Sequence, residues 1–341
     1  MRALFRITAT GFIWLYTILI ASWLLGRYFY GDTIWWFALV NAFAPFLFAP
    51  LLFFLPLGFR VRTRSYWLGL ALPSLIFVTI YGRLFLPRWP IANAAGSPPL
   101  TIMTFNIWSD SPSRQTAQVI RQNNLPDIVA LQELSPAMVK PLLDEVGAFY
   151  PYHIFDLSRH DGLGVLSRYP LTELRSKHFF ALGWQIQMLR VDIGERHFVL
   201  YNCHPRSSNV IYFMESGQSI ANEVQFSYKL RTILIKQLLD DLTERTDPVI
   251  VAGDLNSTPQ SDVYHLLTNK LGDAQREAGW GFGHTYPAYT LYFRHFPIFP
   301  RLVRIDMILH STDFVALNSQ VSPLHGESDH LPVVAQLGWK Q

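Results

Sequence analysis

The stretch VIVAGDLN, residues 249–256, combines a strand with a small group of polar side chains. Val249–Ala252 is an apolar run of the length and composition that predicts a buried β-strand. Asp254 and Asn256 follow it directly, and Gly253 lets the backbone turn tightly beneath them. A carboxylate and an amide at the end of a buried strand indicate a functional site, with a plain Gly-Asp turn as the alternative.

Five other segments of the chain have the same layout. In each, an Asn, Asp, Glu or His stands at the end of an apolar strand-like run or just after it. Cleavage of a phosphodiester needs oxygen ligands for a hard cation, a base for water and hydrogen-bond donors for a crowded phosphate, and these residue types supply all three. The segments are TFN at 104–106, LQE at 131–133, NCH at 202–204, RID at 304–306 and SDH at 328–330.

Taken in order, these segments resemble the endonuclease/exonuclease/phosphatase superfamily, the fold of DNase I-type nucleases and neutral sphingomyelinases. The resemblance extends from Leu100 to about Trp339 and includes GLGVLSRYP at 162–170. It implies a hydrolase acting on ester bonds, a metal-dependent phosphodiesterase, with an α+β fold built as a four-layer α/β/β/α sandwich. The sequence pattern itself favours two mixed sheets with helices outside, because expected strands and helices alternate after Leu100 and strand pairs follow.

The resemblance also implies roles for a metal and for the attacking water. Glu133 and Asp329 would be carboxylate ligands of Mg²⁺, or of Mn²⁺ in its place, and Asn106 would support the metal and a phosphate oxygen. Asp254 would orient or deprotonate the water, and Asn256 would position it. For Glu133, a carboxylate that caps the following helix is the alternative.

Two histidines complete the expected site. Asp306 and His330 are expected to pair, so that the carboxylate sets the imidazole tautomer and supports its positive form. His330 would then contact the scissile phosphate, and His204 is similar to the second phosphate-contacting histidine of the nucleases, with a structural strand-end histidine as the alternative. The residues expected to bind substrate are Asn106, Asn256, His204, Tyr286 and Tyr292.

The first part of the chain has a composition of its own. It contains three successive uncharged runs, and a helix needs about 20 apolar residues to cross a bilayer core. Apolar runs in series would leave no face for solvent, so a buried helix bundle is the weaker alternative, as is a cleaved signal peptide for the first run. We expect a membrane anchor at 1–86, an all-α module of three transmembrane helices at about 7–26, 34–58 and 66–86, followed by a linker at 87–99 and the catalytic domain at 100–341.

Arginines predict the orientation of this anchor. Arg2 and Arg6 precede the first run, and three arginines lie in the short loop at 60–64, whereas the loop between the first two runs has only Arg27. The positive-inside rule then predicts a cytoplasmic N-terminus. We therefore expect an integral protein of the plasma (inner) membrane whose catalytic domain is periplasmic or extracellular.

Charge and aromatic residues bear on the substrate. Residues 1–95 carry eight Arg and one Asp, so the overall charge of +3 leaves −4 for the rest of the chain. A mildly acidic domain argues against a large nonspecific nucleic-acid footprint. The segment TYPAYTLYFRHFPIFP, residues 285–300, is rich in Tyr and Phe with only Arg294 and His295 as basic residues, which suits a bilayer interface. A loop packed on the domain's own core is the alternative.

These observations favour a membrane-anchored, divalent-metal-dependent phosphoesterase. It would hydrolyse a lipid headgroup or another cell-surface phosphodiester by metal-assisted in-line attack of water. A periplasmic or extracellular endo- or exonuclease is the first alternative, and a catalytically silent binding module is an alternative of another class. The expected partners are membrane lipids and the phosphodiester substrate, and no obligate protein partner is evident.

Overall fold

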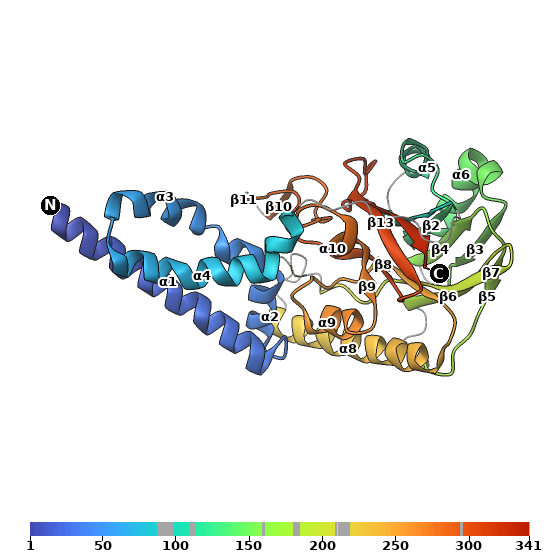
Figure 1. Ribbon diagram of the computed structural model, residues 1–341. Helices are drawn as coiled ribbons and strands as arrows, with labels where there is room; N and C mark the ends of the chain where they lie inside the picture. The colour runs from blue at the N-terminus through green and yellow to red at the C-terminus, as the bar shows by residue number, and fades with distance from the viewer. Residues whose placement is uncertain are drawn as a thin grey trace. The chain divides into compact units, whose positions relative to one another are not determined.

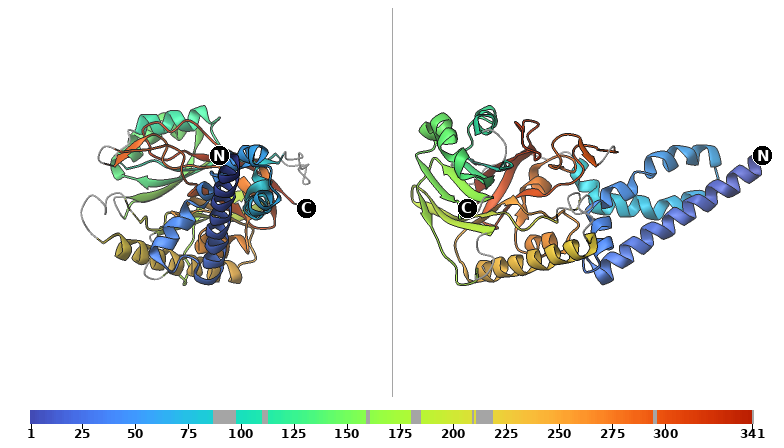
Figure 2. Two further views of the ribbon diagram at one scale, coloured as in Figure 1. Left: turned by 90° about the vertical axis from the view of Figure 1, so that its left-hand side faces the viewer. Right: turned by 180° about the vertical axis from the view of Figure 1, so that it is seen from behind.

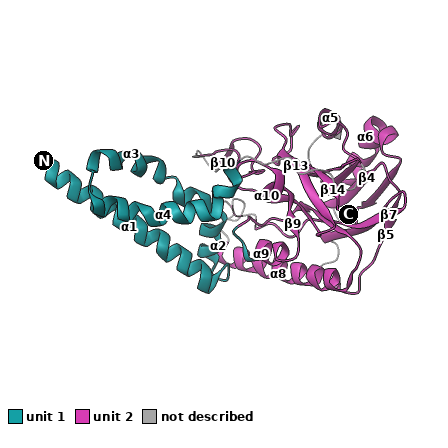
Figure 3. Cartoon of the chain, in the orientation of Figure 1, with its two compact units in different colours: residues 1–86, 260–262 teal, residues 87–259, 263–341 magenta. Residues whose placement is uncertain are grey.

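The chain divides into two compact units (Figure 3), residues 1–86 with 260–262 and residues 87–259 with 263–341. The computed structural model describes residues 1–86, 98–109, 113–158, 161–179, 185–208, 210, 219–293 and 296–340. Most of the expected linker at 87–99 therefore lies outside the described residues, as do parts of the segments 207–226 and 285–300.

All the regular secondary structure among the described residues of the first unit is helical. Three of its stretches are long and apolar enough to cross a membrane, at Arg2–Tyr30, Ala44–Val61 and Arg64–Phe85. Much of their outer surface is apolar, as the 81% exposed side chain of Leu52 illustrates. The elements are α1 (Arg2–Tyr30), α2 (Trp35–Ala42), η1 (Ala44–Phe48), α3 (Leu51–Val61), α4 (Arg64–Tyr81) and η2 (Gly82–Phe85).

The second apolar run differs from the single helix expected at about 34–58. It is divided among α2, η1 and α3. Pro45 lies in the first turn of η1, and Pro50 is the N-cap residue of α3. Proline has no amide hydrogen to donate to the preceding turn, so each of these residues begins a new helical segment instead of continuing the previous one.

Helices α1 and α4 lie side by side and run in the same direction (Figure 1). Helix α3 lies between them in the chain and runs in the opposite direction. The chain therefore runs along the length of the unit three times. Polar side chains set the register, because hydrogen bonds between side chains or to backbone are among the few directional contacts that apolar helices can make. Successive contacts join Thr10 to Thr63 (3.4 Å), Trp14 to Ser65 (3.0 Å) and Thr17 to the carbonyl of Gly69 (2.5 Å).

The second unit contains two six-stranded mixed sheets. The first has the order β13-β14-β1-β2-β4-β3 and the second β5-β6-β7-β8-β12-β9. In each sheet one central pair is parallel, β1 with β2 and β7 with β8, and the other pairs are antiparallel. The strands of the first sheet are β1 (Leu100–Asn106), β2 (Ile128–Leu134), β3 (Tyr152–Asp156), β4 (Gly162–Ser167), β13 (Phe314–Val321) and β14 (Val333–Trp339).

The strands of the second sheet are β5 (Leu171–Glu173), β6 (Ile186–Ile193), β7 (Arg196–Cys203), β8 (Val249–Asp254), β9 (Gly272–Asp273) and β12 (Asp306–His310). A separate two-stranded hairpin consists of β10 (Leu291–Phe293) and β11 (Phe296–Ile298). The remaining elements are α5 (Ser113–Gln122), α6 (Pro136–Val146), η3 (Gly147–Phe149), α8 (Ile220–Glu244), α9 (Asp262–Thr268) and α10 (Ala274–Ala278).

These elements form the expected α/β/β/α sandwich. Alternate residues of a strand point to opposite faces of its sheet, so each central strand contributes to two cores. Ile250 and Ala252 of β8 pack between the sheets, whereas Val249 and Val251 pack against the helices outside. Helices α5 and α6 cover the first sheet and α8 and α9 the second, on opposite sides of the sandwich (Figures 1 and 2).

Candidate active site

The polar residues expected from the sequence meet at one edge of the sandwich. Asn106 and Asp254 are the last residues of β1 and β8, one from each sheet. Asp306 is the first residue of β12 and pairs directly with Asp254 across the antiparallel ladder. Since the sheets pack face to face, strand ends from both sheets reach the same place.

Local backbone geometry brings two of these side chains to the site. Glu133 has a φ of 58° and lies where the pairing of β2 with β4 shifts register, so its side chain leaves the alternation of the strand. Gly253, with a φ of 152°, lies so close to the neighbouring strand that a Cβ would be 1.9 Å from the carbonyl oxygen of Cys203. Only glycine fits at this position, immediately before Asp254.

Asp254 is the most connected carboxylate of the site. It is 1% exposed, and it accepts hydrogen bonds from the side-chain amide of Asn106 (3.1 Å) and from the backbone amide of Asn256 (2.9 Å). Nε2 of His204 lies 3.6 Å from its Oδ2, and Nε2 of His330 lies 3.8 Å from the same atom. Burial raises the pKa of Asp254 to about 6, although the positive charge of His330 opposes the rise.

His330 and Asp306 pair as expected. Nδ1 of His330 lies 2.9 Å from Oδ2 of Asp306, and both side chains are buried. Burial opposes the charged imidazole, but the carboxylates of Asp306, Asp254 and Asp329 outweigh it and raise the pKa of His330 to about 10. The imidazole is therefore positively charged at neutral pH. Oδ1 of Asp306 is buried and has no hydrogen-bond partner among the described residues.

Glu133 and Asp329 supply the remaining carboxylates. Glu133 accepts a hydrogen bond from the Asn106 amide (3.0 Å), and its Oε1 is 3.6 Å from Nε2 of His204. Oδ1 of Asp329 is 4.0 Å from Nε2 of His330. Burial raises the pKa of Asp329, His330 lowers it, and the negative charge of Glu133 raises it further. Two carboxylates that repel one another in a mostly buried site fit a cation between them.

The donor set as a whole suits a hard divalent cation. Carboxylate oxygens are its preferred protein ligands, and the one cysteine, Cys203, is buried with a pKa raised by that burial. Within the described residues, Asp254, Asp306 and His330 also each offer one ligand atom, and these atoms lie within 4.8 Å of one another. A protonated imidazole has no free lone pair, however, so the charged His330 is a poor ligand in this second group.

The two tyrosines expected to bind substrate differ in position. The ring of Tyr286 lies 4.9 Å from that of His330, centroid to centroid, and burial followed by the charge of Asp329 raises its pKa. Tyr292 lies on β10 and is 65% exposed, and it makes no hydrogen bond or ring contact within the described part of the chain. The structure thus brings Tyr286, but not Tyr292, into contact with the side chains of this cluster.

Three supporting residues were not recognised in the sequence, although all three stand inside the motifs. Ser328 donates to the carbonyl of Asn106 (2.7 Å) and accepts from the amide of His330 (3.0 Å), which ties the SDH loop to β1. Gln132 donates to the side chain of Asn202 (2.7 Å), and this fully buried bond links the two sheets beneath the site. Polar residues inside otherwise apolar strands were the signal for this pair.

Arg304, which belongs to the RID motif, has no part in the cluster. Its side chain is buried and forms an ion pair with Asp273 at 2.5 Å. Burial opposes ionisation of Asp273, but Arg304 outweighs it and lowers the pKa of this carboxyl below its usual range. The pair anchors the segment that leads into β12 and so supports the position of Asp306.

A comparison with known protein families matches the part of the chain that contains these site residues. Residues 103–330 match the model of the Endonuclease/Exonuclease/phosphatase family. The chain belongs to this family. Its fold is consistent with a metal-dependent phosphoesterase or nuclease, and members of the family act on phosphodiester bonds and generally use divalent metals. The match begins after the helical unit. No curated protein sequence matches the chain.

Solved structures with the same fold include an endonuclease/exonuclease/phosphatase family protein and structures of TDP2. Truncated Caenorhabditis elegans TDP2 is 17% identical with a TM-score of 0.53, over 72% of this chain and 100% of that one. D. rerio TDP2 complexed with single strand DNA product is 18% identical with a TM-score of 0.52, over 71% and 99%. A family protein from Bacteroides thetaiotaomicron is 15% identical with a TM-score of 0.51, over 72% and 100%. At these identities the similarity establishes the fold.

Proposed function

We propose that this protein is a membrane-anchored, Mg²⁺- or Mn²⁺-dependent phosphodiesterase that acts on a lipid headgroup or another cell-surface phosphodiester. The observation that carries the proposal is the arrangement around Asp254. A buried carboxylate with a pKa of about 6 lies between a charged His330, the His204 imidazole and the Asn106 amide. This combination places a base beside donors for a phosphate.

Asp254 is the residue that we assign to the attacking water. At neutral pH a carboxyl group with a pKa of about 6 is mostly ionised and can accept a proton. Asn256 holds it in place with two hydrogen bonds, from its backbone amide (2.9 Å) and its side chain (3.3 Å). The oxygen that takes the proton is thus oriented before substrate binds.

We assign the phosphate to the histidines. His330 carries a positive charge at neutral pH and is oriented by Asp306, so its Nε2–H can donate to a phosphate oxygen as negative charge develops. Nε2 of His204 lies 3.6 Å from the same Oδ2 of Asp254 and offers a second donor. Donors that are already in position need no reorganisation during the reaction, which is the usual source of electrostatic catalysis.

We assign Glu133 and Asp329 as the ligands of the cation, with Asn106 beside them. These carboxylates repel one another, and among the described residues only the neighbouring histidines are paired with them as cationic side chains. A bound Mg²⁺ or Mn²⁺ would polarise a phosphoryl oxygen and neutralise charge in the transition state. Asn106, which donates to both Glu133 and Asp254, links the metal carboxylates to the proposed base.

The membrane and the substrate follow from the rest of the chain. The helical unit exposes apolar side chains over three stretches of spanning length, and its arginines favour a cytoplasmic N-terminus. The residues after 95 carry a net charge of −4, 20 basic against 24 acidic, whereas binding to a nucleic-acid backbone relies on several Lys and Arg. A lipid headgroup needs no such footprint, because the bilayer itself supplies it at high local concentration.

The test is a substrate panel with the full-length protein in phospholipid vesicles. We expect hydrolysis of a lipid phosphodiester that requires Mg²⁺ or Mn²⁺, stops with EDTA and exceeds hydrolysis of plasmid or single-stranded DNA. A nuclease is the second candidate, favoured by the similarity to a TDP2 structure that holds a single-strand DNA product. Efficient metal-dependent DNA cleavage without lipid hydrolysis would put the nuclease first. No hydrolysis of any phosphoester would favour a silent binding module.

A further inference from the structure

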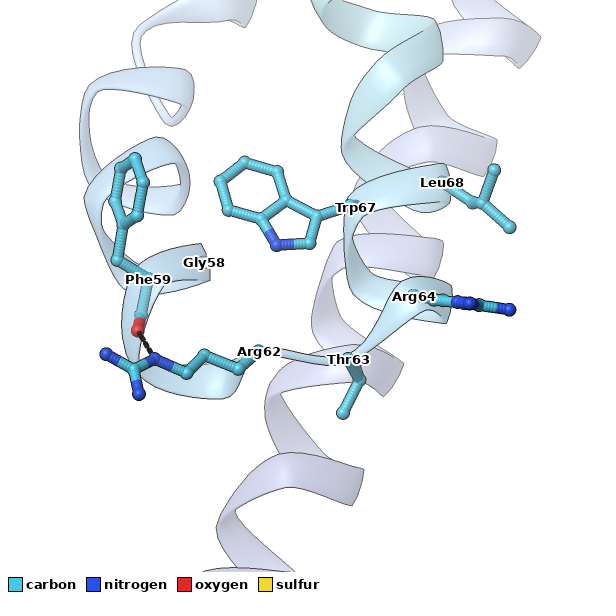
Figure 4. A pocket seen from close by; sticks show the side chains of 7 residues that line it. All are labelled: Gly58, Phe59, Arg62, Thr63, Arg64, Trp67 and Leu68. Carbon is cyan, nitrogen blue, oxygen red and sulfur yellow. Dashed lines mark hydrogen bonds between the residues drawn. The ribbon is translucent and has the colours of Figure 1, made fainter.

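A hollow of about 620 Å³ lies at the turn between α3 and α4, inside the helical unit (Figure 4). Its position is where two of the spanning stretches meet, since one ends at Val61 and the next begins at Arg64. In a membrane, this turn would lie in the layer of lipid headgroups. The residues that matter for its chemistry are Phe59, Arg62 and Trp67.

Two aromatic rings form the apolar part of the hollow. The rings of Phe59 and Trp67 lie 5.4 Å apart, centroid to centroid, in an edge-to-face arrangement. Gly58 makes room for them, because a Cβ at this position would be 2.8 Å from the indole of Trp67. Phe59 is about two-thirds exposed, and so is Leu68, which lies beside the two rings. This surface can accept an alkyl chain.

The polar part of the hollow consists of hydrogen-bond donors. Arg62 adopts a left-handed conformation (φ 54°, ψ 37°) at the end of α3, and its Nε donates to the carbonyl of Phe59 at 2.8 Å. This bond fixes the guanidinium and leaves its terminal nitrogens without a partner among the described residues. The indole nitrogen of Trp67, which also has no acceptor in the described part of the chain, faces the Arg62–Thr63 turn (Figure 4).

The surroundings contain no acid to neutralise this charge. Residues 33–86 include Arg60, Arg62, Arg64 and Arg83 but no Asp or Glu. The contact of Thr10 with Thr63 places the N-terminal turns of α1 at the same level, and Arg6 lies one turn before Thr10. The whole end of the helical unit is therefore cationic. Only an anionic ligand complements it.

We propose that this hollow binds an anionic phospholipid, distinct from any substrate of the catalytic site. The phosphate would accept hydrogen bonds from the terminal nitrogens of Arg62 and from the indole of Trp67, while an acyl chain lies along Phe59 and Leu68. Arginine matches phosphate with paired donors, and tryptophan commonly lies at the membrane interface. With the N-terminus in the cytoplasm, the site faces the cytoplasmic leaflet, where anionic lipids attract basic clusters.

The chain offers closely matched variants to test the site. Asn tolerates the left-handed conformation, so Arg62→Asn removes the guanidinium and keeps the turn. Trp67→Phe removes the indole donor and keeps an aromatic ring. Arg60→Gln removes the same charge from the last turn of α3, at a residue that does not line the hollow, and Arg83→Gln removes it from η2, directly after α4.

The experiment measures binding of phosphatidylglycerol and phosphatidylcholine to delipidated full-length protein by native mass spectrometry. We expect tighter binding of phosphatidylglycerol, weakened about tenfold or more by Arg62→Asn, as the loss of a charged hydrogen bond implies. Trp67→Phe should weaken it to a smaller extent, and Arg60→Gln and Arg83→Gln should change it less than twofold. Monodisperse elution and unchanged circular dichroism establish that each variant is folded.

Three results would overturn the proposal. Equal weakening by Arg60→Gln and Arg62→Asn would indicate general attraction to the basic loop and no defined site. Unchanged phosphatidylglycerol binding in Arg62→Asn would remove the residue on which the site depends. Glycerol 3-phosphate serves as a probe for a tail-free ligand, and its equally strong binding would mean that the hollow holds a free phosphate compound instead of a lipid.

Discussion

Asp254 shows how one buried side chain organises the site. Polar groups from three other parts of the chain and from the neighbouring Asn256 surround its carboxylate, and burial raises its pKa to about 6. An ordinary surface Asp would bind its proton too weakly to act as an effective base near neutral pH. The groups that contact it or lie close to it are the amide of Asn106, the backbone of Asn256, and the imidazoles of His204 and His330.

Substitution of the base or of the charged histidine tests these assignments. We expect Asp254→Asn and His330→Ala each to reduce the hydrolytic rate by on the order of 10²–10⁴, because each removes a group that acts in the transition state. The measurement is the turnover of a soluble chromogenic phosphodiester at saturating Mg²⁺. Thermal unfolding in the same detergent serves as the control for folding. Turnover like that of the wild type in a folded variant would show that the residue is not catalytic.

The buried pair of Arg304 and Asp273 governs stability instead of chemistry. Asp273→Asn should lower stability by about 3–5 kcal/mol, because it leaves the buried charge of Arg304 without its partner. The pKa of Asp273 is lowered in the folded protein, so its ionised form stabilises the fold above its unfolded pKa of about 3.9, and this contribution is lost as pH falls through the folded value.

The difference in stability between wild type and Asp273→Asn should therefore narrow as the pH falls below about 4. Thermal unfolding of both proteins across a pH series measures it. A constant difference from pH 7 down to pH 3 would contradict the assignment of Asp273 as the titrating group.

At the scale of elements, apolar run length made the central strands predictable. β8 is buried along its whole length, β1 along nearly all of it and β7 from Phe198 onward, and each of these stretches contains an apolar run. β13 was not predicted, because polar residues interrupt it and its pairing with β14 contains a register shift. β9 has two residues and owes its existence to pairing with β12, a tertiary contact that no local pattern encodes.

The hairpin of β10 and β11 is the element with the clearest unassigned surface. Tyr292 is 65% exposed, and Phe299 directly after the hairpin is 66% exposed. If this surface enters the headgroup layer, the double variant Tyr292→Ser, Phe299→Ser should lower the ratio of vesicle to soluble-substrate hydrolysis severalfold, since each ring gives up contact with the interface. The measurement compares a lipid phosphodiester in vesicles with a soluble chromogenic one.

The matched control for the hairpin is Phe149→Ser. This ring is also exposed, but it lies in η3, directly after α6 on the outer helical layer. It should leave the ratio unchanged. Equal losses on both substrates in the hairpin variant would assign the hairpin a structural role.

Across the whole molecule, the sequence indicated which residues would form the candidate site, but it did not predict the geometry in which they meet. The residues that meet at Asp254 are spread from Asn106 to His330, and their positions after apolar runs were visible in the sequence. The φ of 58° at Glu133 was not, because it depends on the register of β2 against β4. The role of Gln132 beneath the site was equally hidden, since it depends on how the two sheets pack.

The topology of the chain decides which substrates the site can reach. The parallel arrangement of α1 and α4, with α3 returning between them, gives three passes and opposite faces for the N-terminus and the end of α4. Together with the arginines at 60–64, it predicts that this loop is cytoplasmic and the catalytic unit is outside. The lone Cys203 is buried, so the protein offers a low background for labelling introduced cysteines.

Accessibility of single introduced cysteines in intact spheroplasts therefore measures the orientation. A membrane-impermeant maleimide should label Lys140→Cys, whose native side chain on α6 is 85% exposed, without permeabilisation. Arg60→Cys should be labelled only after the membrane is opened, because this end of α3 would face the cytoplasm. The wild-type chain should remain unlabelled in both conditions. The reverse pattern would place the catalytic unit in the cytoplasm and confine its substrates to cytoplasmic phosphodiesters and the inner leaflet, which would exclude the cell-surface substrate proposed above.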